Sequence, residues 1–208
     1  LLGGWLHPPL HWRYAFLSAA AFLLVAMVLA LRTLPRQQVL PRNAVAVSFF
    51  QLLRRHDLIL LFLCGAGGFA IFSSVFNFLP FRLSEPLFGF STGQITLMYL
   101  VYVMGIFMGP MAGRIGNRIG SGRTLLLGAA VLGLALLCLL LPSAWAIGLG
   151  LLLVCAGFFT VHAAAVGAIN RKLTGGQGRA NALYVLFYYV GGWVGITVAG
   201  FAYSHGGW

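Results

Sequence analysis

Acidic residues are almost absent from this sequence, which has two of them against thirteen Lys and Arg. Charge of either sign is scarce: 7% of the residues are charged, whereas 61% are hydrophobic and the mean hydropathy is +0.96. A water-soluble domain needs far more polar surface than this composition supplies. The composition therefore predicts an integral membrane protein.

Patterns that carry catalysis or metal binding are scarce. No HExxH motif occurs, GxSxG occurs once, at residues 89–93, and His162 has no acidic partner in any apolar stretch. The sequence therefore predicts no enzyme, no cofactor and no nucleic-acid-binding groove. The cysteines lack the spacing of a zinc site, so we expect small buried side chains and no metal at Cys64, Cys138 and Cys155.

Six apolar stretches are long enough, at about 20 residues each, to cross the roughly 30 Å hydrocarbon core of a bilayer. None has an acid, Lys or Arg in its middle, where a basic side chain would cost about 3 kcal/mol. We therefore predict an all-α fold, a polytopic membrane helix bundle with six transmembrane helices. The stretches are residues 14–31, 58–80, 93–113, 124–141, 145–169 and 182–203.

The basic residues are sorted between alternate connections. Eleven of the thirteen lie between stretches one and two, three and four, or five and six, and only Arg13 and Arg82 lie on the other side. By the positive-inside rule, the three basic connections face the cytoplasm. The net charge of +11 then reports membrane orientation. We expect a multi-pass protein of the cell inner (plasma) membrane that contacts anionic lipids.

This orientation places both Leu1 and Trp208 on the non-cytoplasmic side. The sequence has no Met at its start and no signal-peptide pattern. We therefore expect a fragment whose upstream portion contributes an odd number of spans. The final "SHGGW" resembles the segment that directly precedes a further helix, before that helix enters the membrane.

Polar side chains are unevenly shared among the stretches. The second and fifth carry several, whereas the first and fourth have almost none, so we expect the latter two to face lipid and the former two to face protein or a water-filled cavity. The same polarity recurs three stretches apart, as in the internal repeats of secondary transporters. The polar residues are Ser73, Ser74, Asn77, Thr160, His162 and Asn170.

Small residues recur at every fourth position in the third and sixth stretches, a spacing that lets helix backbones touch. Two interpretations stay open: packing within this chain, or close contact with helices absent from it. The residues are Gly105, Gly109, Gly113, Gly191, Gly195 and Ala199.

Three segments resemble a known family. "GPMAGRIGNRIGSGRTLLLG", residues 109–128, resembles the Gly/Arg-rich cytoplasmic signature of the major facilitator superfamily. The opening "LLGGWLHPPLHWRYAF" is similar to the stretch where that family's fifth helix leaves the membrane and its sixth enters. "FFTVHAAAVGAINRKL" followed by "GRANALYVLFYYVGGWVG" resembles the drug-efflux and sugar-efflux type, which is related to proton antiporters.

The resemblance implies a domain organisation. It assigns the helices to numbers 6 to 11 of a twelve-helix transporter, with residues 1–32 ending the N-terminal half, 33–57 forming the cytoplasmic central loop, and 58–208 forming the C-terminal half, truncated before helix 12. Within the loop, "SFFQLLRRHD" could lie on the membrane surface, with Phe49, Leu52 and Leu53 on one face.

The resemblance also implies a function. It is secondary active transport of a small molecule by alternating access, as proton-coupled efflux of drug-like or sugar-like compounds, with membrane lipids and the missing helices of the same chain as further partners. A membrane-embedded enzyme and a passive channel or scaffold are the alternatives.

The signature loop implies a gating role with one departure from the family pattern. An acid usually precedes the first Arg of the loop, and Gly113 stands at that position here. The loop therefore has two equally weighted interpretations, a gating role or an orientation signal alone. Its residues are Gly109, Gly113, Arg114, Gly116, Arg118 and Arg123.

Helices seven and ten line the cavity in the family, which gives a set of candidate residues for the substrate cavity. His162 is expected more as a hydrogen-bonding partner across a helix contact than as a proton carrier. Asn77 fits a ligand contact or a helix–helix hydrogen bond equally, and Arg82 and Glu85 are expected to pair in an external connection. The candidates are Ser73, Phe76, Asn77, Phe159, His162 and Tyr188.

Overall fold

The structure is a computed structural model and describes residues 13–33 and 47–208. All regular elements in these residues are helical. The chain divides into two compact units, one of residues 1–44 and 90–100 and one of residues 45–89 and 101–208. The predicted external loop at 1–12 and most of the predicted central loop, at 34–46, lie outside the described residues.

Helix α2, Arg13–Thr33, belongs to the first unit and has no buried residue. Helix α5, Thr92–Met98, lies in the same unit and begins at a capping box, in which the Ser91 side chain accepts from the Gln94 backbone N–H. The short η1 helix, Tyr99–Val103, continues from α5 along the chain.

The second unit is a bundle of long apolar helices. Its elements are α3 (Phe49–Leu53), α4 (His56–Ser84), α6 (Met104–Ile119), α7 (Ser121–Leu140), α8 (Ala144–Lys172) and α9 (Gln177–Gly206). With α2 and the continuous stretch Thr92–Ile119, the described residues contain six helices long and apolar enough to cross a membrane. The predicted all-α bundle with six transmembrane helices is confirmed.

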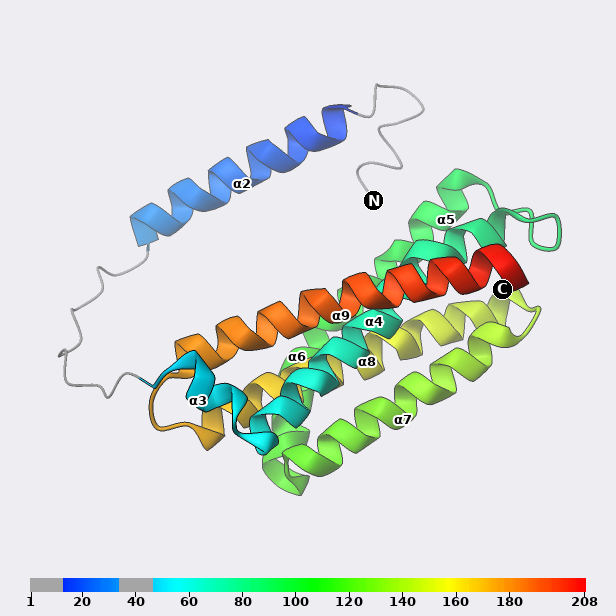
Figure 1. Cartoon of the computed structure of the whole chain (residues 1–208). Coiled ribbons are helices and arrows are strands. Elements are labelled where there is room, and N and C mark those ends of the chain that lie inside the picture. Colours follow the sequence, from blue (N-terminus) through cyan, green and yellow to red (C-terminus); the bar gives the residue numbers. More distant parts are fainter. Residues whose placement is uncertain (1–12, 34–46) are drawn as a thin grey trace. The chain divides into compact units, whose positions relative to one another are not determined.

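Two helix pairs form the core of the bundle. Figure 1 shows α4 running beside α9 and α7 beside α8, and α8 also contacts α4 and α6. Small residues permit this approach: a Cβ on Gly157 would lie 2.8 Å from the Gly128 carbonyl oxygen, and one on Gly195 would lie 2.6 Å from the Ala70 Cα. Backbone contact therefore joins α7 to α8 and α9 to α4.

The helices with polar side chains are the most buried. Half of the most apolar segment is buried in both α4 and α8, against 28% in α7. Leu126 and Leu137, on the outer face of α7, are 72% and 63% exposed. Within the second unit, α4 and α8 are therefore more buried than α7, and the lipid-facing position of α2 and α7 stays a prediction.

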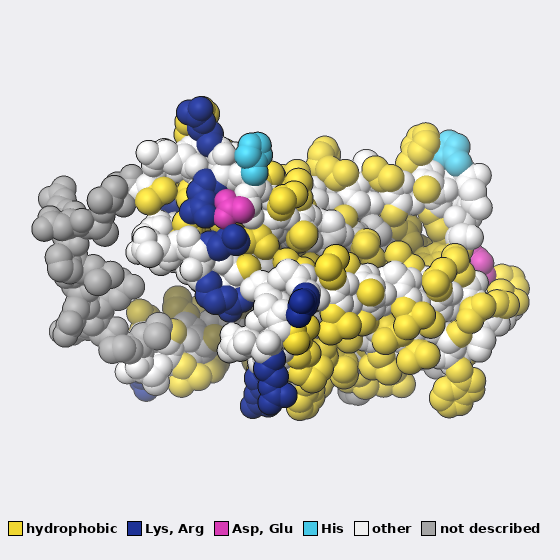
Figure 2. Space-filling view, turned by 90° about the horizontal axis from the view of Figure 1, so that it is seen from below, with side chains coloured by type: hydrophobic (Ala, Val, Ile, Leu, Met, Phe, Trp, Pro, Cys, Tyr) yellow, Lys and Arg dark blue, Asp and Glu magenta, His cyan; other side chains and the backbone are white. Residues whose placement is uncertain are grey.

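Basic side chains gather at one end of the bundle, whereas hydrophobic side chains cover most of the rest of the face in Figure 2. Hydrogen bonds link the basic connections there: Arg179 donates to the Val47 carbonyl at 2.6 Å, and Arg171 donates to the Ser121 hydroxyl. We call this the basic end; its residues are Arg54, Arg55, Arg114, Arg118, Arg123, Arg171, Lys172 and Arg179.

The α3 helix corrects one prediction. Ser48 caps it in a capping box with Gln51, as the sequence permits. Leu52, which was predicted to share a lipid-facing side with Phe49 and Leu53, is fully buried in a core cluster that includes Ile169. Successive helix residues point about 100° apart, so Leu52 can pack against protein while Phe49 and Leu53 remain exposed.

The predicted Arg82–Glu85 pair is wrong. The structure describes ion pairs only at Asp57, with Arg55 and Lys172. Glu85 instead accepts a hydrogen bond of 2.9 Å from the Tyr203 hydroxyl, and Arg82 turns toward the end of α7. Unpaired carbonyls at a helix C-terminus attract a cation as a carboxylate does, and the sequence gives no sign of which helix end is near.

Candidate functional site

An aromatic cluster joins α4, η1, α8 and α9. Helix periodicity places Phe69, Phe72 and Phe76 on neighbouring turns of one face of α4, and this face meets α8 and α9. We call the cluster the aromatic wall; its residues are Phe69, Phe72, Phe76, Tyr102, Phe158, Phe159, His162, Tyr184 and Tyr188.

The rings of the aromatic wall are in close contact. Ring centroids of Phe69 and Tyr188 lie 3.9 Å apart in a stacked arrangement, and those of Phe72 and Phe158 lie 4.2 Å apart. The Phe76 ring lies 4.5 Å from that of Tyr102. Contacts at these separations favour a rigid surface of π-faces.

Part of the wall is open at the surface of the described residues. Tyr102 of the wall is 37% exposed, and Tyr189, a neighbour outside the wall whose ring stands edge-on to Tyr188, is 63% exposed. Phe159, His162 and Tyr188 are half-buried. Such a surface can bind apolar and planar groups, while the Tyr hydroxyls and the His ring provide hydrogen bonds.

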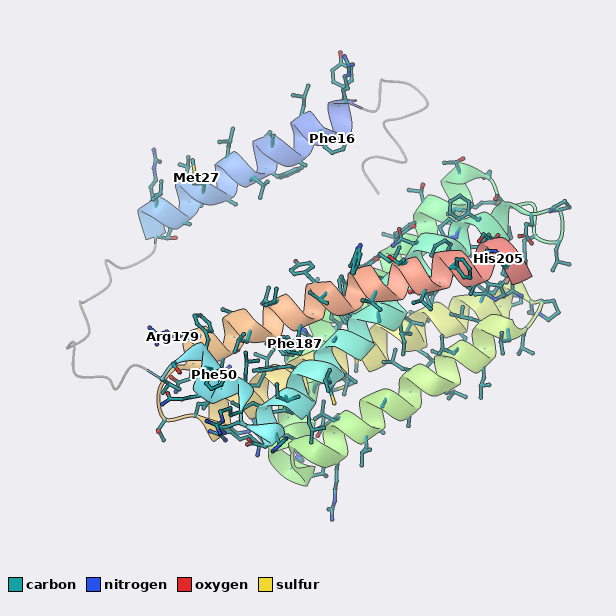
Figure 3. The ribbon with its side chains drawn as sticks, viewed as in Figure 1. Phe16, Met27, Phe50, Arg179, Phe187 and His205 are labelled. Carbon is teal, nitrogen blue, oxygen red and sulfur yellow. The ribbon has the colours of Figure 1, made fainter. Side chains whose placement is uncertain are left out.

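The wall brings together most of the predicted cavity residues. Phe76, Phe159, His162 and Tyr188 belong to it, connected through Phe72 and Phe158. Figure 3 shows the dense side chains between these helices and labels the neighbouring Phe187 of α9. Four of the six sequence-based candidates, one on α4, two on α8 and one on α9, therefore share one region.

Ser73 and Asn77 have other surroundings. Ser73 is buried where α4 meets α9, and its hydroxyl donates 2.6 Å to the Phe69 carbonyl. Asn77 is exposed, and its Nδ2 donates 2.7 Å to the Ser73 carbonyl of its own helix. Of the two interpretations of Asn77, the helix–helix hydrogen bond is therefore not present among the described residues.

His162 forms a hydrogen bond across a helix contact. Its Nδ1 lies 3.0 Å from the hydroxyl of Tyr184, which is 2% exposed. The Tyr184 ring occupies the space where a Cβ on Gly65 would be, so the glycine leaves room for it. The bond joins α8 to α9 at the wall.

Three apolar recesses lie elsewhere in the bundle. The recess with a volume of about 380 Å³ is lined by α4, α7 and α9, including Val75, Leu136 and Ala199. None of the predicted cavity residues lines these recesses. The recesses and the wall are separate features of the bundle.

The predicted gating loop lies at the basic end. Arg114, Arg118 and Arg123 are exposed and make no described hydrogen bond or ion pair with another described residue. The Arg171 side chain lies near Gly116, 3.9 Å from the position of an added Cβ. The loop therefore lies beside the end of α8. The side chains of its three arginines are exposed at the surface of the described residues.

The predicted packing glycines divide into two groups. A Cβ on Gly105 would lie 2.7 Å from the Phe159 ring, and Gly191 and Gly195 meet Ala66 and Ala70 of α4. Gly109 and Gly113 have nothing within 4 Å of an added Cβ. Packing within the chain thus accounts for Gly105, Gly191 and Gly195. Gly109 and Gly113 instead lie on a part of α6 that no other described residue covers.

Sequence reasoning missed the role of Asp57. Its Oδ2 lies 2.7 Å from Arg55 Nη2 and 3.2 Å from Lys172 Nζ, so it connects the start of α4 to the end of α8. The hydrogen bond and charge of Asp57 raise the pKa of Arg55. The scarcity of acidic residues was the signal that could have indicated this role, because the chain has only two acids to balance its basic end.

Together these features define a polytopic α-helical membrane bundle with an aromatic surface among its inner helices. A model of the Major Facilitator Superfamily matches residues 1–195. The chain belongs to this superfamily, a family of membrane transporters.

Relatives support the same family. The chain is 30% identical over 203 residues to the "Inner membrane transport protein YnfM" of Escherichia coli, covering 95% of this chain and 49% of that protein. It is 26% identical over 213 residues to the "Uncharacterized MFS-type transporter YybF" of Bacillus subtilis, covering 100% of this chain and 53% of that protein. The chain spans about half the length of these relatives.

Proposed function

We propose that this chain forms the C-terminal half of a secondary active transporter that moves a small molecule by alternating access. Residues 1–32 end the preceding half, 33–57 form the cytoplasmic central loop, and 58–208 form one wall of the substrate cavity. The aromatic wall carries this proposal, because part of it stays open on the inner helices: Tyr102 is exposed, and Phe159 and Tyr188 are half-buried. Rocking against the other half would open the site to each side in turn.

We further propose proton-coupled efflux of drug-like or sugar-like compounds from the cell, across the inner membrane. A surface rich in aromatic rings suits drug-like compounds by stacking and sugars by packing of their apolar ring faces. The name of the Escherichia coli relative supports the inner membrane. The distribution of basic residues in the present chain supports an orientation with the basic end in the cytoplasm.

Transport by the full-length protein that contains this chain tests the proposal. The purified protein would be reconstituted in proteoliposomes, with a fluorescent aromatic dye or a radiolabelled sugar as the probe and an imposed proton gradient. Saturable flux of a probe against its gradient, with proton counterflow, is the expected result. A channel would give only downhill, non-saturable flux.

Two variants connect that flux to the wall. Phe159→Ala removes a half-buried ring of the wall and should raise KM at least severalfold, while Trp145→Ala removes an 89% exposed ring at the start of the same helix and should not. Residues 1–208 alone should give no saturable flux, because they supply one wall. Equal KM values for the two variants would contradict the proposed site.

A further inference from the structure

Arg82 lies in the last turn of α4, yet its side chain serves another helix. It is 6% exposed and donates from Nη1 to the Leu139 carbonyl and from Nη2 to the Leu140 carbonyl at 3.3 Å. Both carbonyls belong to the final turn of α7, where no intrahelical N–H remains to bind them. The guanidinium therefore closes the C-terminus of a helix 57 residues away in sequence.

Aromatic rings and a helix dipole compensate the buried charge. The Arg82 Cζ lies 4.9 Å from the ring centroid of Trp208 and 5.4 Å from that of Phe88. Trp208 Nε1 donates 3.2 Å to the same Leu139 carbonyl. The nearby acid, Glu85, is bound by Tyr203 from α9. The negative end of α7 is thus the main partner of the cation.

The backbone of α4 is weakened just before this contact. Pro80 lies inside the helix and has no backbone N–H to donate to the turn before it. Helices bend most readily at such positions. The turn that carries Arg82 is therefore connected to the rest of α4 by an incomplete hydrogen-bond ladder.

We infer that Arg82 is a positioning residue that fixes the end of α4 beyond Pro80 to the C-terminus of α7. Helix α7 packs along α8, which carries Phe158 and Phe159. The contact lies at the end of the bundle opposite the basic end. Through α7, it helps to set the spacing between the α4 and α8 parts of the aromatic wall. It acts within the bundle and does not depend on the substrate.

Spin-label spectroscopy on the full-length protein tests this contact. Nitroxide labels at Ser84→Cys and Leu141→Cys, both exposed positions without native cysteine, would report the separation of the two helix ends. A second pair at Leu60→Cys and Leu126→Cys would report α4 and α7 nearer the basic end, where both side chains are exposed. The native cysteines would be replaced in all proteins.

The expected result separates a local contact from general unfolding. Arg82→Gln should broaden and lengthen the separation of the Ser84–Leu141 labels and leave the Leu60–Leu126 pair unchanged. Arg82→Lys should give an intermediate spectrum, because an ammonium group cannot hold two carbonyls with a planar fork.

Arg54→Gln provides the matched control, since Arg54 contacts Phe50 on α3 and not α7. It should change neither pair. An Arg82→Gln spectrum identical to the wild type at Ser84–Leu141 would overturn the inference, and so would equal broadening of both pairs.

Discussion

The Tyr184 hydroxyl and His162 Nδ1 share a hydrogen bond of 3.0 Å between α9 and α8. Both groups are polar, and Tyr184 is almost completely buried. In an apolar bundle such a pair stabilises one helix arrangement, because each group would otherwise lack a partner.

Tyr184→Phe should destabilise the bundle. It removes the hydroxyl and leaves His162 without this partner, at an expected cost of about 1 kcal/mol in the free energy of unfolding. Tyr189→Phe is the control, since Tyr189 is 63% exposed and its hydroxyl has no described hydrogen bond. Denaturant titration in detergent measures the difference. Equal stability of the two variants would show that the bond contributes nothing.

His162→Asn tests whether His162 carries protons. We expect the proton dependence of transport to persist, since the described contact of His162 is with a tyrosine and a structural role needs only a polar partner. Flux would be measured in proteoliposomes with and without a proton gradient. A variant that folds and transports but has lost its response to the gradient would assign proton carriage to His162.

Gly195→Ala should destabilise the α4–α9 contact by roughly 1 to 3 kcal/mol, the cost of overpacking a close interface. The added Cβ would lie 2.6 Å from the Ala70 Cα, and backbone cannot yield as a flexible side chain can. Gly133→Ala on α7 has open space around it and should be neutral or slightly stabilising. Thermal unfolding of the two variants makes the comparison, and a stable Gly195→Ala protein would exclude this contact.

The Asp57–Lys172 pair should contribute little to stability. Its side chains are 38% and 46% exposed, so a double-mutant cycle with Asp57→Asn and Lys172→Gln should give a coupling of about 0.5 kcal/mol. Salt should reduce this coupling further. A salt-insensitive coupling of several kcal/mol would mean that the pair is shielded from water.

Much of the fold follows from the sequence because lipid imposes a simple rule. In a membrane, the backbone N–H and C=O groups must bind within the chain, which a helix achieves. The length of an apolar stretch alone therefore predicts where the helices lie. The second stretch was predicted at 58–80, and α4 extends over His56–Ser84. The added turns contain Asp57 and Arg82, polar residues that hydropathy assigns to the connections.

Helix pairing and individual contacts could be predicted less well. Glycine spacing marks a surface for close approach, but it does not say that Gly195 meets Ala70. Arg82 was expected to pair with the acid three residues away, and it binds carbonyls of α7 instead. These partners depend on how helices distant in sequence cross. Ser73 was placed in the cavity because it is polar, although a hydroxyl can bind its own helix and remain buried.

Sidedness labelling tests the central claim, that the basic connections share one face of the membrane, most directly. Single cysteines at Gln51 and Gly122 mark two of these connections, and cysteines at Leu87 and Ser143 mark the opposite end; all four positions are exposed. A membrane-impermeant thiol reagent should label Leu87→Cys and Ser143→Cys in intact cells, and Gln51→Cys and Gly122→Cys only in inverted vesicles. Labelling of Gln51→Cys and Gly122→Cys from opposite faces would contradict the topology and the function proposed from it.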